Sequence, residues 1–317
     1  MLVCGDSRFI RFAKALFKVF KRAGVPLRFS KFSNRLYTVW QHCVILVLKE
    51  LEGKSYRGII ELLEDCDRVC AFIGLRCLPH FTTLQKFAQR IKTTVLERVL
   101  AGFIRAETRL KKLVLGVDSS GFKLTKASFY YTTVIKRNGG KAVKRIRKYL
   151  KTALIVELRK QLIVAQKLRR GPSNDAKDFI PLLKKACKVS PIKLAVGDKG
   201  YDSEENHRAS REELGVEDTI IPPRNENVPR WKTKGKYRKE LKKKGYKKED
   251  YNQRNKNETV FSVMKRLLGE AVTSRKTGMQ NKEMILKMIA YNAHRTIRIK
   301  IYIKIQRVST EPAFRKL

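Results

Sequence analysis

The chain has 317 residues, of which 43% are hydrophobic, so it can bury a core and is not a wholly disordered polymer. Lys and Arg number 72 against 29 Asp and Glu, which gives a formal net charge of +43. Such an excess favours a polyanionic partner, first of all nucleic acid and second an anionic membrane. No apolar run reaches the ~18–20 residues of a spanning helix, and the N-terminus has no secretory signal pattern. We therefore expect a cytoplasmic protein with no membrane partner.

The first third of the chain is expected to be helical. Residues 1–33 are basic and weakly patterned, which suggests a flexible or helical arm. Apolar residues then recur at helical spacing from Asn34 to Glu52, and again after Ser55. Thr82 and Gln85 have the spacing of a capping box, so they are expected to open a third helix that continues to Val99. This region could present a helix-turn-helix to a DNA major groove, or it could simply pack on the rest of the chain.

One cluster contains residue types that bind zinc: Cys66, Cys70, Cys77 and His80. Their spacings do not match the usual zinc patterns. Cysteines of a helical core are the favoured interpretation, and a zinc site is the alternative.

From about residue 109 the pattern changes to strands alternating with helices. A β-like run from Lys112 ends in Asp118, and a second run from Ile192 ends at Gly197-Asp198. Between them, two strand-like runs joined by residues 159–161 predict a hairpin. Helices are predicted over 175–187, 203–214, 251–268 and 280–297, with a short strand at 219–221. This order predicts an α/β domain built on a mixed sheet.

Two segments are dense in positive charge. Residues 136–151 hold eight Lys or Arg and no acid, and residues 224–256 hold fourteen against four acids. Aromatic residues, including Trp231, are interleaved in the second segment. Because basic groups neutralise phosphates and aromatic rings stack on unpaired bases, this segment is expected to form a nucleic-acid groove. The alternative is a solvated surface.

Three carboxylates come from plausible structural anchors. Asp118 and Asp198 end apolar runs, and Glu258 lies in the helical pattern over 251–268. At ~100° per residue, Tyr251, Arg254, Glu258 and Lys265 fall within an arc of roughly 60° on one helix. Taken singly, the aspartates could be turn or capping residues, and Arg254–Glu258 could be an ordinary ion pair. Asp202 is expected to cap the helix from Ser203, and Asn257 to point ~100° away from Glu258.

Tyr251-x2-Arg254-x3-Glu258-x6-Lys265 resembles the signature of DDE-class insertion-sequence transposases, more narrowly those of the insertion-sequence-four and -five families. The block around Asp198-x-Gly200-Tyr201-Asp202 is similar to that around this family's second aspartate, and Val117-Asp118-Ser119-Ser120-Gly121 to that around its first. The resemblance covers about residues 80–297. It implies an RNase H-like mixed-sheet catalytic domain over 109–300. A helical region at 1–108, which could bind DNA ends, would precede it, and a basic tail at 301–317 would follow.

The resemblance also implies a site and an activity. Asp118, Asp198 and Glu258 would be the catalytic triad and would bind Mg²⁺ or Mn²⁺ as two ions. Tyr251, Arg254 and Lys265 would contact DNA or orient the site, and the basic segment adds Lys242, Lys243 and Lys244 as expected DNA contacts. The 60 residues between Asp198 and Glu258 leave no room for the large β-rich insertion of some relatives.

The implied function is cleavage of element ends and strand transfer into target DNA, by a nucleoid-associated homo-oligomer assembled on the ends. An RNase H-like nuclease that does not join DNA, and a catalytically idle DNA-binding protein derived from a transposase, are the alternatives. Ser119 as the nucleophile of a serine recombinase is a third interpretation, but a metal-dependent site needs no covalent protein–DNA link.

Overall fold

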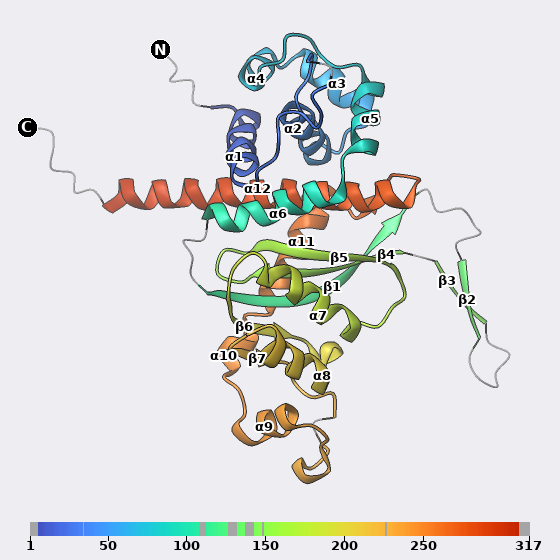
Figure 1. The fold of residues 1–317 in the computed structure, drawn as a ribbon, viewed down its shortest axis with the longest axis vertical. Coiled ribbons are helices and arrows are strands. Elements are labelled where there is room, and N and C mark those ends of the chain that lie inside the picture. Colours follow the sequence, from blue (N-terminus) through green and yellow to red (C-terminus); the bar gives the residue numbers. More distant parts are fainter. Residues whose placement is uncertain are drawn as a thin grey trace, which may run out of the picture. The chain divides into compact units, whose positions relative to one another are not determined.

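The computed structural model describes residues 6–33, 35–107, 112–125, 132–136, 143–147, 149–225 and 227–310 (Figure 1). The chain divides into two compact units, one of Met1–Glu107 with Leu286–Leu317 and one of Thr108–Ile285. Across the described ranges, no helix combines the length and the apolar character that crossing a bilayer requires. The last helix, α12 (Thr277–Thr310), begins in the second unit and continues into the first, so it is longer than the expected 280–297.

The first unit is helical, as expected. Its helices before α12 are α1 (Arg8–Arg22), α2 (Val39–Leu51), α3 (Tyr56–Glu64), α4 (Asp67–Ile73), α5 (Phe81–Arg90) and α6 (Thr93–Glu107). Of the flexible or helical arm expected at residues 1–33, the helical alternative is confirmed over α1, but the weak patterning is wrong, because α1 is amphipathic and buries residues such as Phe12, Leu16 and Phe20. Large apolar side chains at every third or fourth position give α1 a continuous apolar face, so it belongs to the core.

Two features of the helix ends differ from expectation. The capping box is at Thr38 and Gln41, which open α2, whereas Thr82 lies inside the first turn of α5 and contacts His80 Nδ1 through its hydroxyl. The helix expected to run on to Val99 is two helices, because the chain turns at Ile91 between α5 and α6. The Ser55 hydroxyl caps α3 by accepting from Gly58 N–H, in agreement with the sequence.

The second unit is built on a mixed sheet in the order β5-β4-β1-β6-β7. Its strands are β1 (Leu113–Leu124), β4 (Tyr149–Glu157), β5 (Leu162–Gly171), β6 (Ile192–Gly197) and β7 (Asp218–Ile220). The hairpin β4–β5 and the pair β1–β4 are antiparallel, whereas β1–β6 and β6–β7 are parallel. The short β8 (Ala271–Val272) runs parallel to the far end of β1. This is the expected α/β fold with the strand order of an RNase H-like domain.

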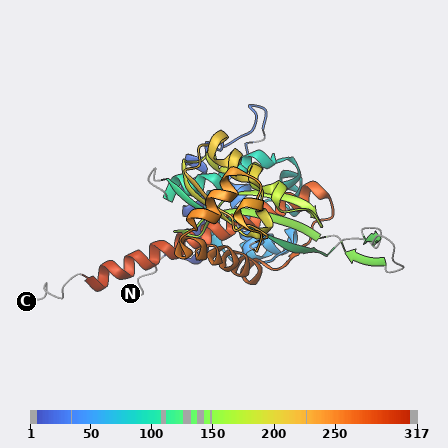
Figure 2. The same cartoon turned by 90° about the horizontal axis from the view of Figure 1, so that it is seen from below.

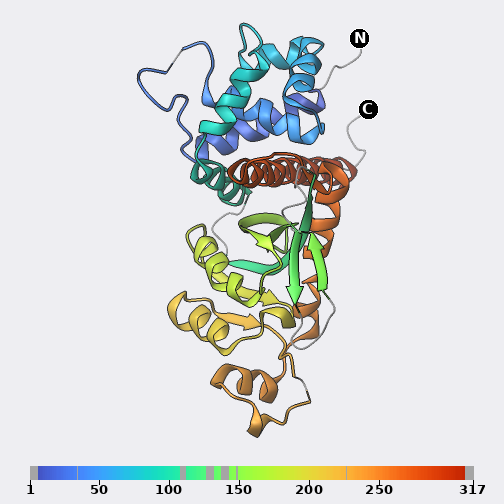
Figure 3. The same cartoon turned by 90° about the vertical axis from the view of Figure 1, so that its right-hand side faces the viewer.

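Helices cover both faces of this sheet. Helix α7 (Ala176–Cys187) packs on β4 and β5, and α11 (Asn255–Leu268) packs on β1 from the other face (Figure 3). The predicted helix at 203–214 is α8 (Glu204–Arg208), continued by a π-helical turn at Ala209–Glu213. Strands β2 (Thr132–Lys136) and β3 (Val143–Arg147) form a separate hairpin set apart from the main sheet (Figure 2). Residues 137–142 and 148 of the first basic segment lie outside the described residues.

The helix predicted over 251–268 is interrupted. Tyr251 lies in α10 (Lys248–Asn252), and α11 begins only at Asn255, although Gly269 ends it as expected. Between them the backbone N–H groups of Arg254, Lys256 and Asn257 each donate to the carbonyl three residues earlier. Such bonds tighten the turn relative to an α-helix, so the single stripe expected for Tyr251, Arg254, Glu258 and Lys265 is not continuous.

Close packing on a glycine brings α11 against β1. Asn257 is fully buried, with no hydrogen-bond partner for its amide among the described residues, and it lies over Gly116 of β1. A Cβ atom on Gly116 would lie 2.5 Å from Asn257 Nδ2 and 2.8 Å from Leu158 Cδ2. The position of Glu258, the next residue, therefore depends on this contact, and Asn257 is not the neutral neighbour that helix geometry suggested.

We predict that Gly116→Ala destabilises the second unit by about 1–3 kcal/mol, because the added methyl overpacks the interface between β1 and α11. Gly278→Ala, in the first turn of α12, is the matched control, since a Cβ there has no neighbour within 4 Å. Urea unfolding of both variants measures the difference. Equal stability of the two variants would show that α11 does not pack closely against Gly116.

Candidate active site

The two aspartates follow the last paired residues of neighbouring parallel strands. The pairing of β1 with β6 ends at Val117 opposite Gly197, so Asp118 and Asp198 are the next residues on each strand. Asp198 follows the end of β6, as predicted. Asp118 does not end its strand, because β1 continues to Leu124 in register with β4; what ends at Asp118 is the pairing with β6.

Each aspartate is held by a nearby backbone N–H group. Asp118 Oδ1 accepts from the N–H of Ser119 at 2.8 Å, and Asp198 Oδ1 accepts from the N–H of Gly200 at 2.7 Å. Asp198 thereby caps the short helical turn Lys199–Tyr201, so its carboxylate has a local structural role. These bonds restrict the orientation of both carboxylates before any ligand arrives.

Asp118 and Glu258 line the same open cleft of about 580 Å³. Its other lining residues are Ser119, Ser120, Phe261, Ser262, Lys265, Arg266 and Glu270. The Glu258 side chain is 61% exposed, and its Oε1 lies 3.3 Å from Arg254 Nη2. The structure thus brings Glu258 to the cleft of Asp118, while Asp198 lies beside Asp118 at the end of β6.

Burial and neighbouring charges together raise the pKa of Asp118 from 3.8 to about 6. Burial raises it most and the charges of Asp198 and Glu258 add to this, whereas the Ser119 N–H and the charge of Arg254 lower it. Among the described residues, no three His, Cys, Asp or Glu side chains come close enough together to hold a metal ion as they stand. The donor set of three carboxylates nevertheless suits a hard divalent cation, because a bound cation would stabilise the charged carboxylates against both burial and their mutual repulsion.

The other residues of the signature are placed differently from one another. Arg254 lies between Glu258 and the ring of Tyr251, whose centroid is 5.8 Å from its Cζ. Tyr251 packs on the hydrophobic cluster of Val114, Leu158, Leu194, Val196 and Ile220, so it supports the sheet. Lys265 lines the cleft and lies over the ring of Phe122, 5.6 Å from its centroid.

The basic segment is attached to the sheet through acids that follow Asp198. The Asp202 side chain is buried, and its Oδ2 accepts from Arg224 N–H at 2.9 Å and from Arg238 Nη2 at 2.6 Å. The expectation that Asp202 caps the following helix is wrong, since Ser203 occupies the capping position. The carboxylate of Glu204 accepts from the N–H groups of residues 237 and 238, and so caps α9 (Lys236–Lys244) from outside.

The three expected DNA-contacting lysines of α9 differ in their surroundings. The Lys242 ammonium donates to the carbonyls of Asn225 and Val228, so it ties down the preceding loop. Lys244 pairs with Glu240 at 2.7 Å, and Lys243 is exposed. Trp231, in the same segment, is 75% exposed, and the Lys232 ammonium lies 4.7 Å from its ring centroid.

Acids at adjoining strand ends of a mixed sheet in this order are the arrangement of an RNase H-like catalytic domain. Residues 109–293, more than half of the chain, match the family described as "Transposase DDE domain", and the chain belongs to this family. None of the curated proteins matches the sequence.

Two solved structures show a general likeness to the chain. One is the piggyBac transposase synaptic complex with hairpin DNA, at 12% identity and a TM-score of 0.41, covering 97% of this chain and 82% of that chain. The other is the Drosophila P element transposase strand transfer complex, at 12% identity and a TM-score of 0.33, covering 91% of this chain and 65% of that chain. The assignment to the family rests on the match of residues 109–293.

The raised pKa predicts that ionised Asp118 lowers the free energy of unfolding. Because the folded state binds this proton more tightly than the unfolded chain, the cost develops as the pH rises from about 4 to about 6 and is complete above. We expect Asp118→Asn to raise the free energy of unfolding at pH 7.5 by about 1–3 kcal/mol without divalent ions, and the gain to shrink near pH 4. Urea unfolding at both pH values measures it, and an Asn variant less stable than wild type at pH 7.5 would contradict the prediction.

Proposed function

We propose that this transposase-family protein is the enzyme of an insertion sequence, which cuts the ends of its element and joins them to target DNA. The observation that carries the proposal is the register of β1 and β6, which sets Asp118 beside Asp198 next to the cleft that Glu258 also lines. This arrangement belongs to a chain with a formal net charge of +43, which favours a DNA substrate.

Asp118, Asp198 and Glu258 are proposed to hold Mg²⁺ or Mn²⁺, as two ions. Rotation of the exposed Glu258 side chain away from Arg254 is the movement within this chain that the proposal requires. Bound ions would supply charge neutralisation at the carboxylates and activation of the attacking water or 3′-hydroxyl. Arg254, once released from Glu258, and Lys265 at the cleft are proposed to hold the phosphates next to the scissile bond.

The helical unit is proposed to find the element ends, either through a helix-turn-helix or by another face. Deleting residues 1–104 is a poor test of this role, because the end of α12 belongs to the same unit and would lose its buried environment. Substituting exposed basic residues of this unit, followed by footprinting on end DNA and on random DNA, tests it without that loss.

Glu258→Gln, Asp118→Asn and Asp198→Asn should each lower Mg²⁺-dependent strand transfer of a labelled end oligonucleotide by about 10³-fold or more, because the transition state needs correctly placed charge. DNA binding should persist, since the basic surface supplies the affinity. Glu217→Gln is the matched control, because this exposed acid pairs with Lys112 at the surface. Wild-type strand transfer by Glu258→Gln at matched folded concentration would sink the triad assignment.

The same assay separates the alternatives. A wild-type protein that nicks DNA but never joins it would be an RNase H-like nuclease. One that binds DNA and does neither would be an idle derivative of a transposase.

The basic segment should bind DNA through its exposed lysines and not through Lys242. Neutralising Lys239 and Lys243 together, both of which are exposed, should lower the slope of log K against log salt by about 2 units, since each phosphate contact contributes about 0.9. The exposed pair Lys184 and Lys193 on α7 and β6 is the control with the same loss of charge. Equal slopes for the two double variants would remove α9 from the DNA interface.

A further inference from the structure

Ser119 links the two faces of β1 at the candidate active site. Its N–H donates to Asp118 Oδ1 at 2.8 Å, and its hydroxyl donates to Asp175 Oδ1 at 2.6 Å. Since neighbouring side chains of a strand point to opposite faces, Asp118 faces α11 while Ser119 faces α7. Asp175 directly precedes the first residue of α7. It is connected to the carboxylate of Asp118 through a single residue, Ser119, which hydrogen-bonds to both aspartates.

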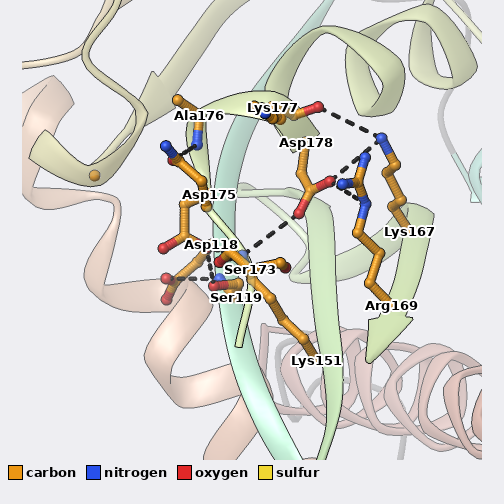
Figure 4. Close-up of polar contacts among 12 residues, drawn as sticks. Asp118, Ser119, Lys151, Lys167, Arg169, Ser173, Asp175, Ala176, Lys177 and Asp178 are labelled. Carbon is orange, nitrogen blue, oxygen red and sulfur yellow. Dashed lines mark hydrogen bonds and ion pairs between the residues drawn. The ribbon is translucent and has the colours of Figure 1, made fainter. Parts of the chain in front are cut away.

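Asp175 is itself held by a network of charges on the α7 face, of which Lys151 and Asp178 are buried (Figure 4). The Lys151 ammonium lies 2.6 Å from Asp175 Oδ1 and 3.5 Å from Asp178 Oδ2, and it donates to the carbonyl of Ser173 at 2.8 Å. Asp178 also pairs with Lys167 at 3.3 Å and with Arg169 at 2.9 Å.

The burial of this network makes it rigid. The side chains of Lys151 and Asp178 are 5% and 1% exposed, so each must keep its partners or leave a buried charge uncompensated. β4 and β5 bring Lys151 opposite Arg169, and α7 brings the two aspartates over them. The network therefore fixes Asp175, and Asp175 fixes the hydroxyl of Ser119.

Strand β1 needs such a support at this place. Its pairing with β6 ends at Val117, and its next partner on a parallel strand is Ala271, opposite Lys123. Between these residues β1 is paired only with β4. Asp118 and Ser119 are the first residues of this stretch, in which one edge of β1 makes no backbone hydrogen bonds to a neighbouring strand of the described residues.

Tyr201 is a buried group on the α7 side of the site, where its ring lies 5.7 Å from that of Phe179 between centroids. Burial raises the pKa of Tyr201 most, and the charges of Asp175, Asp118 and Asp198 raise it further.

We propose that Ser119 and Asp175 are positioning residues that hold Asp118 in its ligating orientation, with Lys151 and Asp178 as their fixed base. The inference rests on the proposed function, in which Asp118 binds a divalent ion. Asp175 acts through Ser119 and is not itself assigned as a ligand, because Lys151 and Ser119 already occupy its Oδ1.

The test uses the full chain without DNA and two readouts. In hydrogen exchange without metal, Ser119→Ala and Asp175→Asn should speed the exchange of residues 117–121 while leaving β6 as in wild type. In calorimetric titration with Mn²⁺, both variants should bind about tenfold more weakly, the size expected when an outer-shell partner of a metal ligand is removed. Ser119→Thr, which keeps the hydroxyl, should restore both measurements.

Asp218→Asn is the matched control, an acid at the start of β7 that is 56% exposed and pairs with Arg211. The proposal is overturned if residues 117–121 exchange as in wild type in both test variants, if β6 loosens equally, or if Ser119→Thr fails as Ser119→Ala does. A wild-type protein that binds no Mn²⁺ would instead refute the proposed metal site, and the exchange data would still decide the positioning role.

Discussion

The end of the parallel ladder between β1 and β6 is the constraint on which the candidate active site depends. Up to Val117 and Gly197 the two backbones hold each other in register, and directly beyond this point each strand carries an aspartate. Main-chain hydrogen bonds thus set the separation of two like charges that repel each other in the absence of a cation. Burial raises the pKa of Asp118 most, and the charge of Asp198 adds to that effect.

Because side chains alternate along β1, the residues near the cleft lie on one face of the sheet and Ser119 lies on the other. Gly116, Asp118 and Phe122 face α11, where they lie next to Asn257, the cleft of Glu258 and the ammonium of Lys265, respectively. Ser119 faces α7 and the charges around Lys151. The candidate active site on one face is therefore backed by an ionic network on the other, and β1 contributes residues to both.

Much of this arrangement could be predicted from the sequence, and the failures have physical reasons. Apolar runs located β1, β4, β5 and β6, because a strand buried on both faces is apolar throughout. Helical periodicity correctly placed Glu258 on a helix, but it did not predict the tight turn at Arg254. Gln253 and Arg254, between α10 and α11, both have helical backbone angles, so the turn leaves little trace in the spacing of the residues. The buried roles of Asn257 and Asp202 could not be predicted, because a polar residue in a helix or turn gives no sign of what tertiary packing will cover it.

The segment from Asp198 to Glu204 carries three acids with different structural roles. Asp198 lies beside Asp118, and Asp202 and Glu204 hold the basic segment at Arg238 and at the start of α9. The polypeptide that forms one wall of the candidate active site is therefore also the anchor of the surface proposed to bind DNA. Only a few residues separate Asp198 from this anchor, and the turn between them is held by the bond from Gly200 N–H to Asp198 and by the bond from Arg224 to the Gly200 carbonyl.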